Sequence, residues 1–203
     1  FTKVILKLSA PLVRDKVYNV TTQNVTDCSG NVIGAKRSAK VGLSRIADSL
    51  DIVVNEILFN PPSGGYDYVE LYNKSNKIID LNQTYIANRN TNGVISSITQ
   101  LSPEPYLLFP EDFIVVSENS AWVKKTYVSQ NPDAFIEVAS MPSFNDDAGD
   151  VIVLNGQGKI TDEVVYSDKW HFKLLDNSEG VALERIDYAG VSRSEEHTSE
   201  LQS

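Results

Sequence analysis

Hydrophobic and polar residues alternate in short runs along most of the chain, as they do in β-strands. The clearest runs are IVVNEILF (52–59) and DYVELYN (67–73), which a PPSGGY turn separates. From residue 51 onward the pattern predicts strands at 52–59, 68–72, 78–80, 85–88, 113–117, 135–137, 151–154, 162–166 and 181–186. Many short strands divided by turn-forming residues predict a β-sandwich or barrel.

One segment has a helical pattern instead. In SENSAWVKKTYVSQNP (117–132) the apolar residues recur at helical spacing. Either Ser117 or Asn119 can cap the helix, and Pro132 ends it. The glycine-containing NGQGK (155–159) stands between two strand patterns and lacks P-loop spacing, so it predicts a hairpin turn.

The N-terminal part of the chain predicts a smaller β-unit. VILKL (4–8), VYNVTTQNV (17–25) and residues 39–42 have strand character, and TDCSGN (26–31) predicts a turn. Three strands are too few for a stable sandwich of their own. The following segment, 43–50, is expected to be a linker.

Composition and charge narrow the choice of partners. The chain is 41% hydrophobic and 22% charged, which is typical of globular proteins. Its net charge is −9, and an acidic surface repels phosphate backbones, so no nucleic acid partner is expected. No apolar run approaches the roughly 18 residues of a membrane helix, so no membrane span is expected in this sequence.

The stretch DIVVNEILFNPPSGGYDYVELYNKSNKIID (51–80) resembles the opening of a lamin tail domain. Residues 142–167, PSFNDDAGDVIVLNGQGKITDEVVYS, and residues 167–187, SDKWHFKLLDNSEGVALERID, resemble later parts of the same domain. The resemblance implies an all-β, immunoglobulin-like β-sandwich of the lamin tail type with one short helix. It also implies a module that binds a partner or serves as a spacer between domains and does not catalyse a reaction.

Two further resemblances divide the chain. Residues 7–33, KLSAPLVRDKVYNVTTQNVTDCSGNVI, resemble the closing strands of bacterial Ig-like domains, and RSEEHTSELQS (193–203) resembles a translated sequencing adapter. We therefore expect the C-terminal part of an Ig-like domain with its linker at 1–48. A lamin tail domain without its final strand is expected at 49–192, followed by a non-native tail.

The family resemblance also implies a setting. We expect a non-catalytic binding or spacer module of a multidomain bacterial protein, located outside the cell or in its envelope. The chain begins at Phe1 without a methionine, so a signal peptide is not visible. The expected partner is an unknown protein or glycan at the cell surface. The alternatives are an accessory domain of an extracellular hydrolase, such as a nuclease or phosphatase, and a carbohydrate-binding module.

Few residues offer catalytic chemistry. Glu56 and Glu70 each lie in an apolar strand, where a buried carboxylate needs a partner, and we expect a structural polar role for both. Cys28 and His171 are too few for a zinc site, and a Ser-His-Asp triad would have to use His171 beside Trp170. We expect no catalytic residue and no cofactor.

Two weaker sets of binding candidates remain. Acidic and amide side chains crowd one loop, where they could bind calcium or cap their own turn: Asn145, Asp146, Asp147 and Asp150. Aromatic rings could stack on a sugar or simply pack at the sandwich rim: Trp122, Trp170, Tyr66 and Tyr68.

Overall fold

The computed structural model describes residues 5–32, 34, 37–171, 177–188 and 201–202. The first large sheet contains β3 (Ile52–Leu58), β4 (Tyr68–Asn73), β9 (Phe113–Ser117), β10 (Phe135–Glu137), β13 (Leu183–Arg185) and β14 (Leu201–Gln202). The second contains β6 (Thr84–Arg89), β7 (Ile95–Gln100), β11 (Ala148–Asn155) and β12 (Ile160–Ser167). The remaining elements are β1 (Tyr18–Thr21), β2 (Ser38–Val41), β5 (Ile79–Asp80), β8 (Leu107–Leu108), the α-helix α1 (Ser120–Thr126) and the 3-10 turns η1 (Leu81–Gln83) and η2 (Asp168–Trp170).

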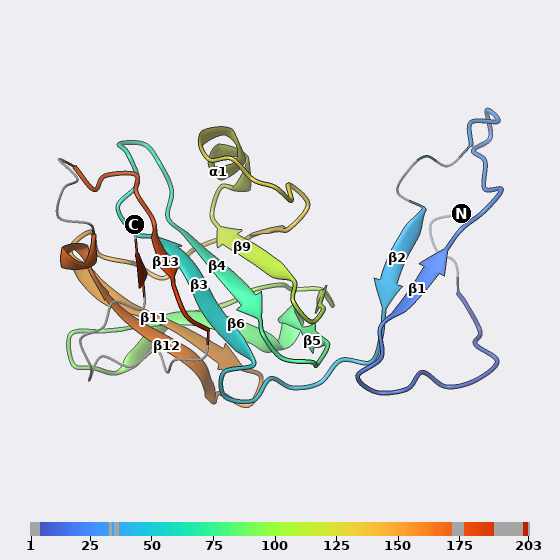
Figure 1. Ribbon diagram of the computed structural model, residues 1–203, viewed down its shortest axis with the longest axis horizontal. Helices are drawn as coiled ribbons and strands as arrows, with labels where there is room; N and C mark the ends of the chain where they lie inside the picture. Colours follow the sequence, from blue (N-terminus) through green and yellow to red (C-terminus); the bar gives the residue numbers. More distant parts are fainter. Residues whose placement is uncertain (1–4, 33, 35–36, 172–176, 189–200, 203) are drawn as a thin grey trace.

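The two large sheets lie face to face and form a β-sandwich, while β1 and β2 form a hairpin to one side of it (Figure 1). The strand order is β10-β9-β4-β3-β13-β14 in the first sheet and β12-β11-β6-β7 in the second. Neighbouring strands are antiparallel except for β9 and β10. This confirms the predicted all-β, immunoglobulin-like sandwich with one short helix.

Apolar side chains from both sheets meet in one core. Ile57 and Leu71 of the first sheet belong to the same buried cluster as Val153 and Tyr166 of the second. Burying one such side chain contributes about 1.5–3 kcal/mol, and the alternating sequence supplies one on every second strand position. Each of the nine strands predicted from residue 51 onward overlaps an observed strand, whereas β7, β8 and β14 were not predicted.

A β-bulge at Asn55 interrupts the alternation of β3. The register with β4 shifts between Val54 and Glu56, so Asn55 is the extra residue. As a result Val54 and Ile57 both reach the core although they are three positions apart. The bulge keeps the apolar side chains inside while Glu56 stays on the outer face.

A buried ion pair satisfies the backbone at this bulge. Asp162 accepts hydrogen bonds from the Val54 N–H, at 2.8 Å, and from Arg185 Nη2, at 2.8 Å. Arg185 Nε donates to the Val54 carbonyl at 2.7 Å. The side chains of Arg185 and Asp162 are each 1% exposed, so the pair joins β13 and β12 across the core at β3.

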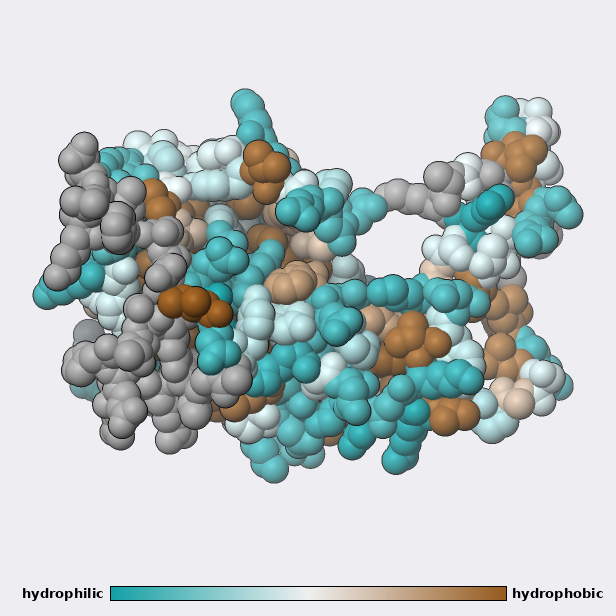
Figure 2. Space-filling model, in the orientation of Figure 1, coloured by the Kyte–Doolittle hydropathy of each residue, from teal (hydrophilic) through white to brown (hydrophobic). Residues whose placement is uncertain are grey.

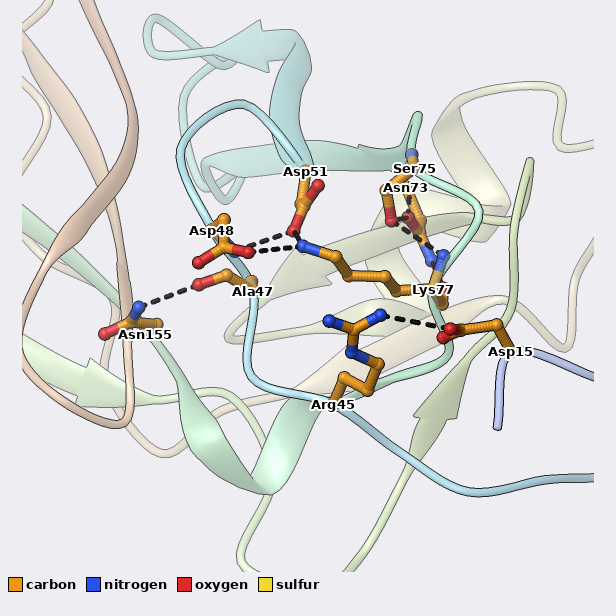
Figure 3. Close-up of polar contacts among 9 residues, drawn as sticks. All are labelled: Asp15, Arg45, Ala47, Asp48, Asp51, Asn73, Ser75, Lys77 and Asn155. Atoms are coloured by element: carbon orange, nitrogen blue, oxygen red, sulfur yellow. Dashed lines mark hydrogen bonds and ion pairs between the residues drawn. The ribbon is translucent and has the colours of Figure 1, made fainter. Parts of the chain in front are cut away.

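The segment expected to be a linker packs into the sandwich (Figure 3). Ala47 is 2% exposed and belongs to the main core. Its carbonyl accepts a hydrogen bond from Asn155 Nδ2 at 2.8 Å. Lys77 Nζ forms ion pairs with Asp48, at 2.6 Å, and with Asp51. The chain is therefore fixed to the sandwich several residues before β3 begins.

The N-terminal unit differs from its prediction. Residues 5–8 of the expected first strand have no strand structure, and Val4 lies outside the described residues. The hairpin of β1 and β2 does form, and the turn at 26–31 is held by Asp27, whose Oδ1 accepts from Ser29 N–H and Asn31 N–H, each at 2.8 Å.

The helix is shorter than predicted. Asn119 rather than Ser117 caps α1, accepting from the Trp122 N–H at 2.9 Å, because Ser117 belongs to β9. The helix ends at Thr126, well before Pro132. Among the described residues no helix is long and apolar enough to cross a membrane. Two residues of the expected adapter-derived tail form β14, which pairs with β13.

Replacing Arg185 tests the role of the buried pair. Arg185→Leu leaves the Asp162 charge buried without its cation, and we expect a loss of about 3–5 kcal/mol in urea unfolding. The double variant Arg185→Met/Asp162→Leu should remain at least about 2 kcal/mol less stable than wild type, because the Val54 N–H and carbonyl lose their partners. A double variant as stable as wild type would show that the bulge does not need the pair.

Truncation tests the anchoring of the segment before β3. A chain that starts at residue 45 should unfold like the whole chain, since it keeps Ala47 and Asp48. A chain that starts at residue 51 should lose about 2 kcal/mol or more, because Asn155 loses its buried acceptor. Thermal and urea unfolding followed by circular dichroism provide the measurement. Equal stability of the two truncated chains would contradict this account.

Candidate functional site

Three glutamates form a row on the outer face of the first sheet. The register of β3 with β4 places Glu56 opposite Glu70, and that of β13 with β3 places Glu184 opposite Glu56. Neighbouring strands are about 4.8 Å apart, so the row extends across roughly 10 Å. Glu56 and Glu70 thus come from adjacent strands, and Glu184 joins them from a segment more than 100 residues away.

Hydrogen bonds hold the two partly buried carboxylates of the row, those of Glu56 and Glu70, in place. The Tyr68 hydroxyl donates to Glu56 Oε1, and Asn55 Nδ2 donates to Glu70 Oε1 at 2.6 Å. Asn55 Oδ1 in turn accepts from the Tyr188 hydroxyl at 2.6 Å. The bulge residue thus connects Tyr188 to Glu70. Both carboxylates have the polar partners expected of buried acids.

Burial and the repulsion between neighbouring negative charges raise the pKa of Glu56 and of Glu70. Desolvation is the largest cause for Glu56, where the hydrogen bond from Tyr68 opposes it and the charges of Glu70 and Glu184 add to it. Desolvation also raises the pKa of Glu70, against the hydrogen bond from Asn55 and with the charge of Glu184. The negative charges of this row are therefore only partly compensated within the protein.

The row lies on the floor of a groove of about 1140 Å³, which we call the acidic groove. The lining includes Val123 of α1, the residues that follow the helix at 127–131 and 133–135, and Tyr188. Residues 106–109 and 111–113 and the hairpin residues Ala39 and Lys40 also line the groove. The visible face in Figure 2 is mainly hydrophilic, with separate apolar patches.

The hairpin is held to the sandwich by Lys40. Its Nζ forms an ion pair with Asp112 at 3.1 Å and lies 5.2 Å from the ring centre of Phe109. Both partners belong to the loop after β8, and residues of the hairpin and of the sandwich together line the acidic groove.

Three of the four candidate sugar-stacking rings gather beside α1. Trp122 packs edge-on against Tyr66, with ring centres 6.1 Å apart, and against Tyr127, at 5.9 Å. A Cβ at Gly65 would lie 2.7 Å from the Trp122 ring, so this ring is tightly packed on one side. Tyr68 contacts Tyr127 and lines the acidic groove.

The fourth ring, Trp170, stands apart. It lies in η2, is 36% exposed and does not line the acidic groove. The four rings therefore do not form a common platform for a sugar.

The candidate calcium loop does not gather its oxygens around one point. Asp147 Oδ1 accepts from the Ala148 N–H at 2.8 Å, as in a self-capped turn, and the Asn145 carbonyl accepts from the Tyr166 hydroxyl. Asp146 lies in the same loop, whereas Asp150 lies within β11. In the described part of the chain, no group of three or more His, Cys, Asp or Glu side chains could hold a metal ion.

His171 and Cys28 lie in different parts of the molecule. The His171 ring is 7% exposed and packs 5.6 Å from the Phe59 ring centre, and burial lowers its pKa. Neither ring nitrogen has a hydrogen-bond partner among the described residues. Cys28 is exposed in the turn of the N-terminal unit. This arrangement indicates packing of His171 rather than a triad.

Several groove residues were not identified from the sequence. Asn55 looked like a polar interruption of a strand, and the bulge that aims it outward has no simple signal. Tyr127 and Tyr188 are ordinary tyrosines until the fold brings them to the groove. Glu184 could have been identified from the sequence, because it is the one acidic residue at an outward position of the strand ALERI (182–186).

The fold and the groove together define an immunoglobulin-like β-sandwich with a recess on the outer face of one sheet. The model of the family described as Lamin Tail Domain matches residues 46–168, more than half of the chain. The chain therefore belongs to the lamin tail domain family, as the sequence resemblance implied. No curated protein matches the chain.

The raised pKa values predict how stability depends on pH. A carboxyl group whose pKa is raised by folding stabilises the fold below its ordinary pKa, and this contribution is lost as the pH rises through the folded value. The isosteric variant Glu56→Gln/Glu70→Gln should match wild type near pH 4. At pH 7–8 it should be more stable by roughly 1 kcal/mol, the size of an unfavourable cross-strand charge pair.

Urea unfolding across this pH range measures the difference. Glu104→Gln serves as the control, because Glu104 is exposed and lies outside the acidic groove. A stability gain in Glu56→Gln/Glu70→Gln that is the same at pH 4 and pH 8 would show that the ionised carboxylates do not destabilise the fold.

Proposed function

We propose that this chain is a non-catalytic binding module of a multidomain bacterial protein that is secreted or displayed at the cell surface. The acidic groove is its recognition site. The observation that supports this most strongly is the groove itself, whose lining combines aromatic and apolar side chains with acidic ones, two of them fixed by hydrogen bonds. Concave sites of this kind, where convergent polar groups with shifted pKa values meet apolar surface, are candidate ligand sites.

The chemistry of the row favours binding over catalysis. A pair of acids that divides the work of general acid and general base has environments that separate their pKa values. Here desolvation shifts the pKa of Glu56 and Glu70 in the same direction. The hydrogen bonds from Tyr68 and Asn55 also hold both side chains in place, which suits a preformed binding surface.

Two related functions stay open as alternatives. As an accessory domain of an extracellular hydrolase such as a nuclease or phosphatase, the module would recruit that enzyme's substrate or hold the enzyme at a surface. As a carbohydrate-binding module it would need a ring face for stacking. The packing of Trp122 against Tyr66 and Tyr127 leaves Tyr68 as the candidate ring that faces the acidic groove.

Screening glycan and peptide arrays with three proteins tests the proposal: wild type, Glu184→Trp and Glu104→Trp. Glu184 is exposed on the groove floor, so a tryptophan there fills the groove without disturbing the core. Glu104 is an exposed acid elsewhere, which makes Glu104→Trp a matched control. We expect array ligands whose binding falls at least tenfold in Glu184→Trp and stays unchanged in Glu104→Trp.

Other outcomes would contradict the proposal. A ligand that binds wild type and Glu184→Trp equally well would place recognition outside the acidic groove. A glycan signal that Trp170→Ala removes would place it at η2. Turnover of any array compound by the purified chain would show that the module is an enzyme.

A further inference from the structure

In the part of the chain that the structure describes, the carboxylate row has no cation paired with it. Among the described residues, no lysine or arginine forms an ion pair with Glu56, Glu70 or Glu184. Like charges directly opposite each other in a sheet are destabilising, and Glu56 and Glu70 are also partly buried. A positive charge placed over the row would favour the ionised form of Glu56 and Glu70.

The rest of the groove lining has the same charge imbalance. Six carboxylates line the groove, from Glu56, Glu70, Glu111, Asp112, Asp133 and Glu184, against the single ammonium of Lys40. Lys40 is already paired with Asp112. The groove therefore presents a negative field, which attracts cationic ligands and excludes anionic ones.

Aromatic rings of the lining already accept cations within the protein. Lys124 Nζ lies 4.5 Å from the ring centre of Phe135, and Lys40 Nζ lies over Phe109. Both rings line the groove. Tyr68, Tyr127 and Tyr188 surround the carboxylate row with further rings. Carboxylates next to ring faces form an environment suited to an ammonium or guanidinium group.

The size and shape of the groove favour a cationic side chain of a polypeptide over a metal ion as the ligand. A metal ion needs several ligands around one point, and among the described residues no three or more His, Cys, Asp or Glu side chains are grouped so that they could hold one. A volume of about 1140 Å³ instead has room for a stretch of polypeptide. A row of roughly 10 Å matches the reach of an extended side chain, and a planar guanidinium can bind carboxylates with two hydrogen bonds at once.

We infer that the acidic groove binds a polypeptide segment that places an arginine or lysine side chain along the row of Glu70, Glu56 and Glu184. The cationic head lies between the carboxylates, and the aliphatic part of the side chain packs against Tyr68 and Val115 on the groove floor. The inference depends on the proposed function, because it specifies the class of ligand for the same site.

Titration of the whole chain with short peptides, followed by NMR of its backbone amides, tests this inference. The probe is acetyl-Gly-Gly-Arg-Gly-Gly-amide, and the control peptide contains citrulline, the uncharged isostere of arginine. We expect shifts centred on Asn55, Glu56, Glu70 and Glu184, and at least about fivefold weaker binding of the citrulline peptide.

Two variants isolate the charge of the row. Glu184→Gln should weaken the arginine peptide about three- to tenfold, whereas Glu104→Gln removes the same charge outside the groove and should leave affinity unchanged. Glu56→Gln/Glu70→Gln should lower the affinity further. The dispersion of the NMR spectrum shows that each variant is folded. Binding to wild type should weaken as salt is added.

Three results would overturn the inference. Equal affinity for the arginine and citrulline peptides would show that charge is not recognised. Equal losses in Glu184→Gln and Glu104→Gln would show unspecific attraction to an acidic protein. An array ligand lost in Glu184→Trp but retained in Glu184→Gln would uphold the proposed function while rejecting a cationic ligand.

Discussion

The ion pair between Arg185 and Asp162 is the interaction on which the sandwich and its groove depend. It lies in the core, where separating charges from water is costly unless each charge and backbone group has a partner. Here the pair takes up the N–H and carbonyl of Val54, the residue just before the bulge. One contact thus joins three strands from both sheets.

The groove follows from the same contact. Because Arg185 points inward, its neighbour Glu184 points outward, and the register with β3 places it beside Glu56. The bulge that the pair stabilises also turns Asn55 toward Glu70 and Tyr188. The interior of the sandwich therefore determines which polar side chains meet on its surface.

The sequence predicted most of the sandwich but little of the groove. Apolar runs and alternation located the long strands: residues 151–154 are all apolar and buried, whereas in 162–166 buried and less buried positions alternate. It missed β7, ISSITQ, whose side chains are mostly polar and partly exposed. The pairing of Glu184 with Glu56 depends on sheet order, which local patterns do not contain. The helix was predicted too long for a related reason. Ser117 belongs to β9, and the helix ends at Thr126.

The bulge also has an evolutionary consequence. Deleting Asn55 would shift Val54 along β3, away from Arg185 and Asp162, and would leave the buried pair without the backbone N–H and carbonyl that it now bonds. The extra residue, Arg185 and Asp162 should therefore be gained or lost together among descendants of this fold. An alignment column with an insertion at position 55 would then identify, from sequence alone, the relatives that share this core.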